Sequence, residues 1–225
     1  MRRKIRDHQG EKNMKKLLAV ISFATLIALP QFCRAEDITR FAPLKAEELS
    51  PAQKAWADTI AAPPRNGKFV NPPYRAYIRS PDLAPKLTAL AEHLRWNTSL
   101  PPRLSEMAIL ITARQWTAQY EWFAHYPLAI KAGLDPKVAG DIAAGRRPDA
   151  MKADEAALYD LAMALYRDKK VSDPVYKAAL ERFGERGIID IIAIMGFYDI
   201  TSMTLITMQA GAPNDSVPPL PILAK

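Results

Sequence analysis

Three ionisable residues lie close together in a mainly apolar stretch of the chain, residues 103–134. Glu121 precedes His125 by four residues, so the two side chains share one face if the stretch is helical. A carboxylate beside an imidazole raises the pKa of the imidazole and orients the ring, which makes the pair a candidate for proton transfer. The alternative is an ordinary contact on a helix surface, which adds little to stability.

A second carboxylate, Glu106, lies 15 residues before Glu121. In one straight helix that separation is roughly 22 Å, at about 1.5 Å per residue, which is too long for a single small-molecule site. Thr117 offers a place for a break, because it can cap a new helix whose first turn contains Glu121. We therefore predict two helices that meet at residues 115–118 and bring Glu106 beside His125.

The elements around this stretch are delimited by proline and glycine. Ser50 and Ser80 each precede a proline and are predicted N-caps, and the residues between the first two helices, 63–73, are predicted to form an extended loop. No segment alternates as a strand would. The predicted helices cover residues 51–62, 81–97, 102–133 with a break near Thr117, 135–145, 153–168, 173–184 and 188–210. This pattern predicts an all-α fold of about seven to eight helices.

Composition favours one globular domain and gives no support for nucleic-acid binding. The chain has 225 residues, of which 49% are hydrophobic, enough for one sizeable core. Of the net charge of +7, residues 1–35 supply +6, from eight basic and two acidic residues, so the other 190 residues carry only +1. Neither a phosphate-binding loop nor a dinucleotide-binding motif is present in the sequence.

The first 35 residues have the three parts of a secretory signal. Lys15 and Lys16 precede an apolar run, Leu17–Leu29, and cleavage is predicted after the small residue Ala35. Met14 is an alternative start of the protein. The run has 13 residues, too few to span a bilayer. We therefore expect a periplasmic or secreted protein that is free of the membrane after cleavage.

Cysteine usage follows from the same cleavage. The single cysteine of the chain, Cys33, leaves with the signal. The mature protein is then expected to lack cysteine nucleophiles, disulfides and cysteine metal sites. The predicted organisation is a signal peptide at 1–35, an N-terminal helix and proline-rich loop at 36–73, a helical domain at 74–210 and a proline-rich tail at 211–225. The tail is expected to run extended over its own surface or over that of a neighbour.

The residues between about 74 and 209 resemble the carboxymuconolactone decarboxylase family of the alkyl hydroperoxidase D-like (AhpD-like) superfamily. The resemblance rests on Leu100-Pro101-x-Arg103-x-x-Glu106, Glu121-Trp122-x-x-His125, Ala132-Gly133-Leu134 and Gly196-Phe197-Tyr198. In the peroxidase branch a Cys-x-x-Cys pair precedes the histidine. Ala118 and Glu121 occupy those positions here, so the thiol chemistry of that branch is not possible, whereas Glu121 matches an acid of the decarboxylase branch.

The resemblance implies an AhpD-like helical bundle, a homo-oligomer and a cofactor-independent carboxy-lyase that removes a carboxylate from a lactone acid. In that reaction His125 would transfer the proton, and Glu121 would orient the His125 ring and favour its charged form. Glu106 would be a second acid or base. Candidate substrate contacts are Arg103, which could hold a carboxylate, Tyr120 and Trp122. Because an exported protein is separated from the cytoplasmic pathway of that lactone, we expect another lactone or keto acid as the substrate.

Two other interpretations of the same residues stay open. The chain could be a non-catalytic helical module that binds a small molecule with Trp116, Tyr120 and Trp122, or Glu106, Glu121 and His125 could bind a metal such as zinc. Our expectation is that no metal and no cofactor is needed. His93 is expected on the surface or in helix packing, and Tyr198 and Asp199 are expected to serve as core and capping groups, with a position facing the site as the lesser alternative.

Overall fold

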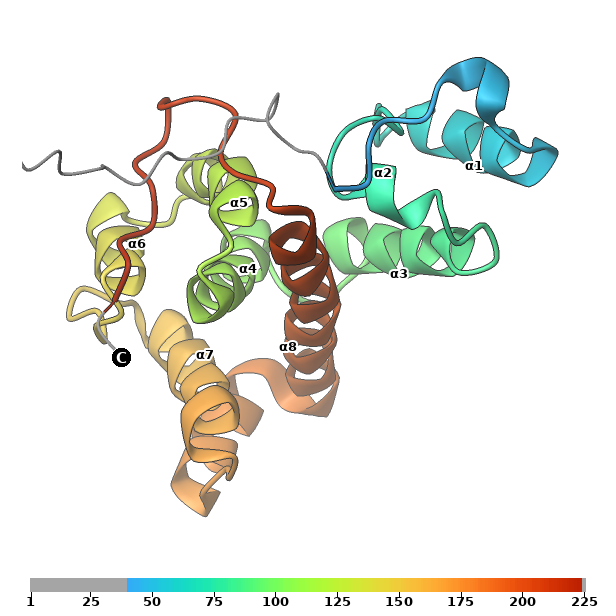
Figure 1. Ribbon diagram of the computed structural model, residues 1–225. Coiled ribbons are helices and arrows are strands. Elements are labelled where there is room, and N and C mark those ends of the chain that lie inside the picture. The colour runs from blue at the N-terminus through green and yellow to red at the C-terminus, as the bar shows by residue number, and fades with distance from the viewer. Residues whose placement is uncertain (1–39, 224–225) are drawn as a thin grey trace, which may run out of the picture. The chain divides into compact units, whose positions relative to one another are not determined.

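The computed structural model describes residues 40–223, and in that range the chain is helical, without a strand. The predicted all-α fold of seven to eight helices is therefore confirmed. The predicted signal peptide lies outside the described residues. The helices are α1 (Pro51–Ala61), α2 (Tyr74–Tyr77), α3 (Ala84–Trp96), α4 (Pro102–Trp116), α5 (Gln119–Lys131), α6 (Pro136–Ala143), α7 (Ala153–Met163) and α8 (Asp173–Met208), with a 3-10 turn η2 (Ala46–Glu48) and a π-helical turn η3 (Ala164–Asp168) (Figure 1).

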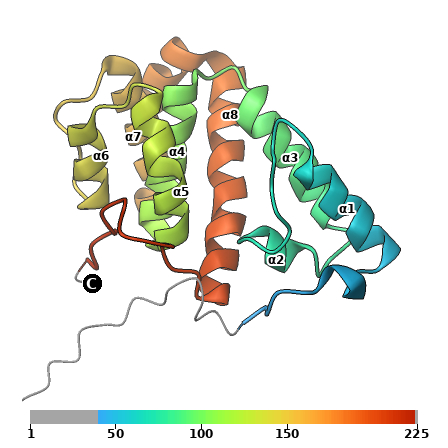
Figure 2. The same cartoon turned by 90° about the horizontal axis from the view of Figure 1, so that it is seen from above.

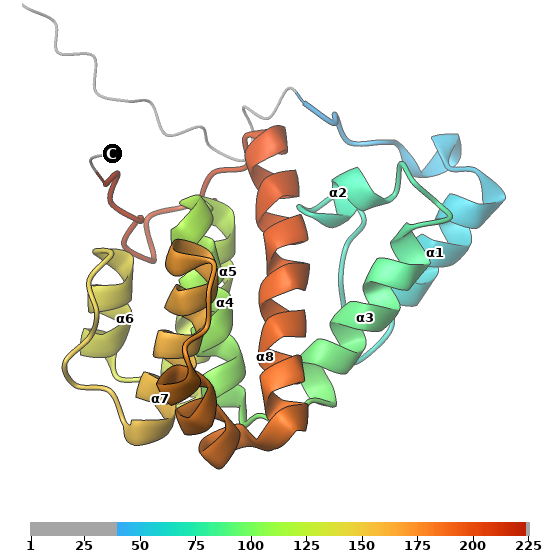
Figure 3. The same cartoon turned by 90° about the horizontal axis from the view of Figure 1, so that it is seen from below.

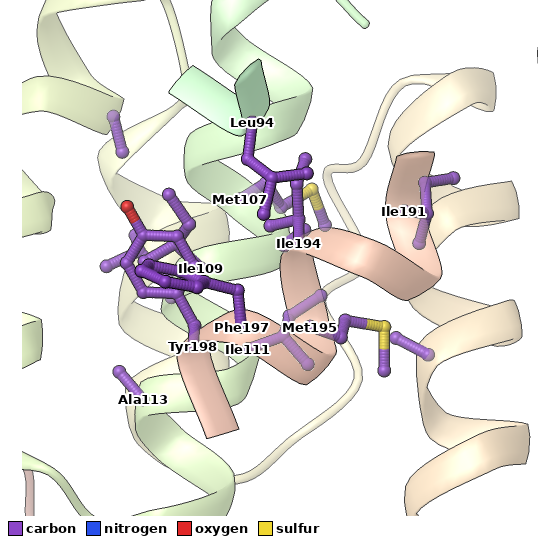
Figure 4. Close-up of a cluster of buried hydrophobic side chains, with 14 of the residues drawn as sticks. Leu94, Met107, Ile109, Ile111, Ala113, Ile191, Ile194, Met195, Phe197 and Tyr198 are labelled. Atoms are coloured by element: carbon purple, nitrogen blue, oxygen red, sulfur yellow. The ribbon is translucent and has the colours of Figure 1, made fainter. Parts of the chain in front are cut away.

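Helix α8 lies between α4 and α5 on one side and α3 on the other (Figure 2 and Figure 3). Apolar side chains of α3, α4 and α8 meet there, among them Met107 and Ile194, which are fully buried (Figure 4). Length and composition alone would allow α8 to cross a membrane, but half of its most apolar window is buried inside the protein. Its backbone leaves the helical conformation at Gly184 (φ 63°, ψ 177°), where glycine has no steric penalty and where a helix end was predicted.

The two predicted serine caps have different outcomes. Ser50 caps α1 as expected, because its side chain accepts a hydrogen bond from the Gln53 backbone N–H while the Gln53 side chain accepts one from the Ser50 backbone N–H. The prediction that Ser80 caps the next helix is wrong, since α3 begins only at Ala84. Pro85 has no N–H to donate back to the carbonyl of Pro81, so residues 81–83 remain turns. The short helix α2, which lies between α1 and α3, was not predicted.

The break between α4 and α5 lies where it was predicted, but its cause differs. Thr117 is the C-cap of α4 and has left-handed dihedrals (φ 53°, ψ 39°), and the N–H of Ala118 bonds the carbonyl of Ala113 at 2.8 Å. The expectation that Thr117 caps α5 is wrong, because the N-cap of α5 is Ala118, which makes no side-chain cap. The Thr117 hydroxyl instead accepts a hydrogen bond from the Arg114 guanidinium. The two helices fold back on each other at this corner.

The C-terminal tail runs over the surface of its own chain. Leu220 is buried, and its backbone N–H and carbonyl both bond the side chain of Gln119, at 2.9 and 2.8 Å. The Arg114 guanidinium also donates to the carbonyl of Pro221 at 2.7 Å. The tail therefore fastens onto the corner between α4 and α5 (Figure 1).

Candidate active site

The corner between α4 and α5 brings the three ionisable residues of the sequence prediction into contact. His125 Nδ1 lies 2.6 Å from Glu106 Oε2, across the two helices. His125 Nε2 lies 3.2 Å from Glu121 Oε1, one turn earlier on α5. Each ring nitrogen therefore faces its own carboxylate, and the predicted approach of Glu106 to His125 is confirmed.

The imidazole of His125 is held in its charged form. Burial alone lowers the pKa of His125, because it penalises a charge, but the attraction of Glu106 and the hydrogen bonds to both carboxylates outweigh burial and raise that pKa to about 9. At neutral pH both ring nitrogens carry a proton; Nδ1 donates its proton to Glu106, and Nε2 faces the carboxylate of Glu121. The resting group is therefore an acid, ready to give up a proton.

Arg95 and Tyr198 complete the cluster; the sequence analysis gave Arg95 no role and placed Tyr198 at the site only as the lesser alternative. Arg95 Nη2 lies 3.7 Å from Glu106 Oε1, and Arg95 Nη1 donates to the Tyr198 hydroxyl at 3.3 Å. The Tyr198 ring meets the His125 ring edge-on, with 5.0 Å between centroids. Burial raises the pKa of Tyr198, so its hydroxyl stays neutral and its own hydrogen can point to a ligand. Tyr198 is thus both a buried core residue and part of the cavity wall, which was the lesser alternative.

A weak signal for Arg95 did exist in the sequence. It follows Ala91 by four residues on α3, and Ala91 is buried, so an arginine lies on the inward face of this amphipathic helix. A charged residue on such a face needs a partner. The sequence could not say which partner, since Tyr198 lies 103 residues away.

The cluster opens into a cavity of about 380 Å³. Helices α3, α5 and α8 form its walls, and α2 and the loop before it contribute the remaining surface. This volume is in the range of small-molecule sites. The cavity is lined by Pro64, Arg65, Pro72, Pro73, Tyr74, Tyr77, Leu87, Thr88, Ala91, Arg95, Trp96, Tyr120, Glu121, Ala124, His125, Phe197, Tyr198 and Thr201.

The three candidate substrate contacts have different environments. Tyr120 lines the cavity. Trp122 points into the core, where it is 2% exposed and packs against Tyr126. Arg103 lies away from the cavity, because its guanidinium is paired with Asp154 at 2.6 Å and with Glu155. Only Tyr120 of these three is therefore placed to touch a ligand in this cavity.

Other residues singled out from the sequence also lie away from the cavity. Trp116 is partly exposed and donates to Asp199 Oδ1 at 2.6 Å, and the same oxygen accepts the Tyr166 hydroxyl at 2.9 Å. Asp199 therefore ties three elements together. His93 is exposed on α3, as expected.

The arrangement of donors does not resemble a metal centre. Within residues 40–223, no group of three or more His, Cys, Asp and Glu side chains is arranged to hold an ion. Both ring nitrogens of His125 instead face a carboxylate, Glu106 at 2.6 Å and Glu121 at 3.2 Å.

Comparison with known proteins identifies the fold. No protein-family model and no curated protein matches the sequence. Among solved structures, the chain is similar to ATU0492 of Agrobacterium tumefaciens, a protein of unknown function provisionally described as an antioxidant defence protein, AhpD. The likeness has a TM-score of 0.55 at 15% sequence identity and covers 61% of this chain and 94% of the other. The chain has an AhpD-like fold.

Proposed function

We propose that the protein is a cofactor-independent acid–base enzyme that decarboxylates, or moves a proton on, a small lactone or keto acid. The observation that carries this proposal is the protonated His125, held between Glu106 and Glu121 at the wall of a ligand-sized cavity. A buried acid beside a cavity is the usual arrangement of a proton-transfer site. The decarboxylase-like motif around these residues supports the same reaction class.

The chemistry follows from the protonation state. When the carbon–carbon bond to the substrate carboxylate breaks, carbon dioxide leaves and its electron pair remains on the substrate as an enolate. His125 donates a proton to that carbon, and the ring regains one from solvent. Arg95 and the neutral hydroxyl of Tyr198 lie beside the ring and can stabilise the enolate oxygen before protonation.

The charges of the cluster suit this cycle. Glu106 and Glu121 supply two negative charges, and Arg95 and His125 supply two positive charges. When His125 releases its proton the cluster becomes negative, which draws a proton back from water. The two glutamates thereby return the enzyme to its resting state.

The thiol chemistry of the peroxidase branch has no residues to carry it. Ala118 and Glu121 stand where that branch has cysteines, and the one cysteine of the chain is Cys33. The antioxidant description of the structural neighbour is therefore not carried over to this chain.

The test uses His125→Gln, with His93→Gln as a matched control on the exposed face of α3. Purified protein is incubated with a panel of lactone acids and β-keto acids while carbon dioxide is measured. We expect at least one substrate to be turned over by the parent and by His93→Gln, with a loss of about 10²- to 10⁴-fold in His125→Gln. Equal turnover in His125→Gln, with a normal thermal transition, contradicts the proposal.

A second function, small-molecule binding without turnover, is favoured by one observation. Six aromatic side chains line the cavity, namely Tyr74, Tyr77, Trp96, Tyr120, Phe197 and Tyr198. Such a wall binds a flat ligand whether or not a reaction follows. Binding by calorimetry, without carbon dioxide release from any member of the panel, would favour this function over the enzyme.

We also propose export of the protein and its assembly into a homo-oligomer. Export is supported by the signal-like pattern of the first 35 residues. Assembly is supported by exposed apolar residues at helical spacing along α8, Ile189, Ile192, Ile200, Met203 and Ile206. Light scattering on the parent and on Ile192→Glu tests the assembly: a smaller particle in the variant is expected, and a parent that is monomeric contradicts it.

A further inference from the structure

Among the described residues that line the cavity, one positively charged side chain has no buried carboxylate beside it. Each positive group of the cluster has a buried carboxylate next to it, as described for Arg95 and His125. Arg65 is different, because it also lines the cavity but comes from the loop between α1 and α2. Its positive charge can therefore attract an anionic ligand that enters the cavity.

The surroundings of Arg65 leave its guanidinium incompletely satisfied. Its side chain is 8% exposed, and its Nε atom is buried without a hydrogen-bond partner in the described part of the chain. Nη1 donates to the Tyr74 hydroxyl at 3.1 Å, and Nη2 reaches the carbonyl of Thr88 only at 3.5 Å. The nearest carboxylate, Glu92, is 3.9 Å away and 45% exposed, so water screens that pair.

An aromatic surface lies directly beneath this cation. The Arg65 guanidinium carbon lies 5.2 Å from the centre of the Trp96 ring, and Arg95 approaches the same ring at 6.0 Å. Trp96 therefore contacts both Arg65 and Arg95 of the acid–base cluster. A ligand that lies on this ring meets a flat apolar wall beside the Arg65 cation.

We propose that Arg65 binds the carboxylate of a flat, unsaturated ligand and sets the preference of the cavity for anions. The planar guanidinium matches a carboxylate in geometry, and a buried donor without a partner gains most from such a ligand. This inference rests on the proposed function only in taking the same cavity as the site. Arg65 is a specificity residue here, because it holds a group remote from the proton that His125 moves.

The experiment compares two probes that differ in charge but hardly in shape, benzoate and benzamide, by isothermal titration calorimetry. We expect the parent to bind benzoate at least about tenfold more tightly than benzamide, the ratio that corresponds to about 1.4 kcal/mol. Arg65→Gln should remove that preference, and Arg65→Lys should keep part of it. Glu92→Gln, which frees Arg65 from its weak partner, should bind benzoate more tightly than the parent.

The control is Arg147→Gln, which removes an exposed arginine paired with Asp160 outside the cavity and should leave both affinities unchanged. Equal affinities of the parent for the two probes, no benzoate binding, or a preference that survives in a folded Arg65→Gln protein would each overturn the inference. Because calorimetry needs no turnover, a panel without carbon dioxide release leaves this result standing. Conversely, equal probe affinities leave the role of His125 untouched.

Discussion

Two clusters of buried charge lie on helix α4, and they differ in what they face. At the start of the helix Arg103 is paired with Asp154 and Glu155, which tie α4 to α7. About one turn further along, Glu106 meets His125 and Arg95. The first cluster contains no histidine and lies away from the cavity; the second contains one and opens into it. Burial of charge is therefore not enough to mark a site, and access together with a group that titrates near neutrality makes the difference.

The largest expected effect is on stability, in the first cluster. Arg103→Met leaves Glu155, which is 1% exposed, without its cation, and removal of one partner of a buried pair costs about 3 to 5 kcal/mol. Urea denaturation should show this loss, and the protein that remains folded should keep its turnover. The exposed pair of Arg147 and Asp160 is the control, where Arg147→Met should change stability by less than about 1 kcal/mol. A small effect in Arg103→Met would remove the distinction between the two clusters.

The second largest expected effect is on the pH dependence of stability, which should differ between the two clusters. Folding raises the pKa of His125 from 6.5 to about 9, so its stabilising effect is complete below pH 6.5 and is lost as the pH rises through about 9. At about 1.4 kcal/mol per pKa unit, this shift corresponds to a loss of about 3 to 4 kcal/mol. In the other cluster burial acts to raise the pKa of Asp154, but the hydrogen bond and the charge of Arg103 together with backbone hydrogen bonds outweigh it and lower that pKa, so the contribution of Asp154 is lost only in acid.

Unfolding free energies measured between pH 6 and 10 test this contrast. The decline over that range should flatten in His125→Gln and persist in Arg103→Met. A decline of the same size in both variants would show that His125 is not its source.

A smaller effect is expected from Arg95→Gln. Removal of this cation leaves two carboxylates around His125, which raises the pKa of the ring further and makes it a weaker acid. Turnover should fall by about tenfold, equivalent to about 1.4 kcal/mol, and the alkaline limb of the pH–rate profile should move to higher pH. An unchanged limb would indicate that Arg95 has only a structural role.

The smallest effect on stability is expected from Tyr198→Phe. The variant keeps the edge-on contact with His125 but loses the hydroxyl that accepts from Arg95, a single hydrogen bond worth about 1 kcal/mol. A urea midpoint shifted as far as that of Arg103→Met would mean that the ring, and not its hydroxyl, had been disturbed.

The sequence predicted the helices and the meeting of three site residues because both depend on local spacing. The separation between Glu106 and Glu121 demanded a break, and the structure has one at Thr117. The roles of Arg95 and Tyr198 depend on contacts between distant helices, which no local pattern specifies. The pairing of Arg103 with Glu155, 52 residues away, has the same origin. Trp122 and Tyr120 are two residues apart on α5, so they point to different faces, and only the fold shows which face meets the cavity.

The fastening of Leu220 onto Gln119 has a consequence for the support of the site. The corner that carries Glu106 toward His125 shares three hydrogen bonds with Leu220 and Pro221, through the side chains of Gln119 and Arg114. Neither tail residue lines the cavity. A change in the tail would therefore keep every residue of the acid–base cluster but remove part of what holds the corner, so the geometry of the site depends on a segment that never touches it.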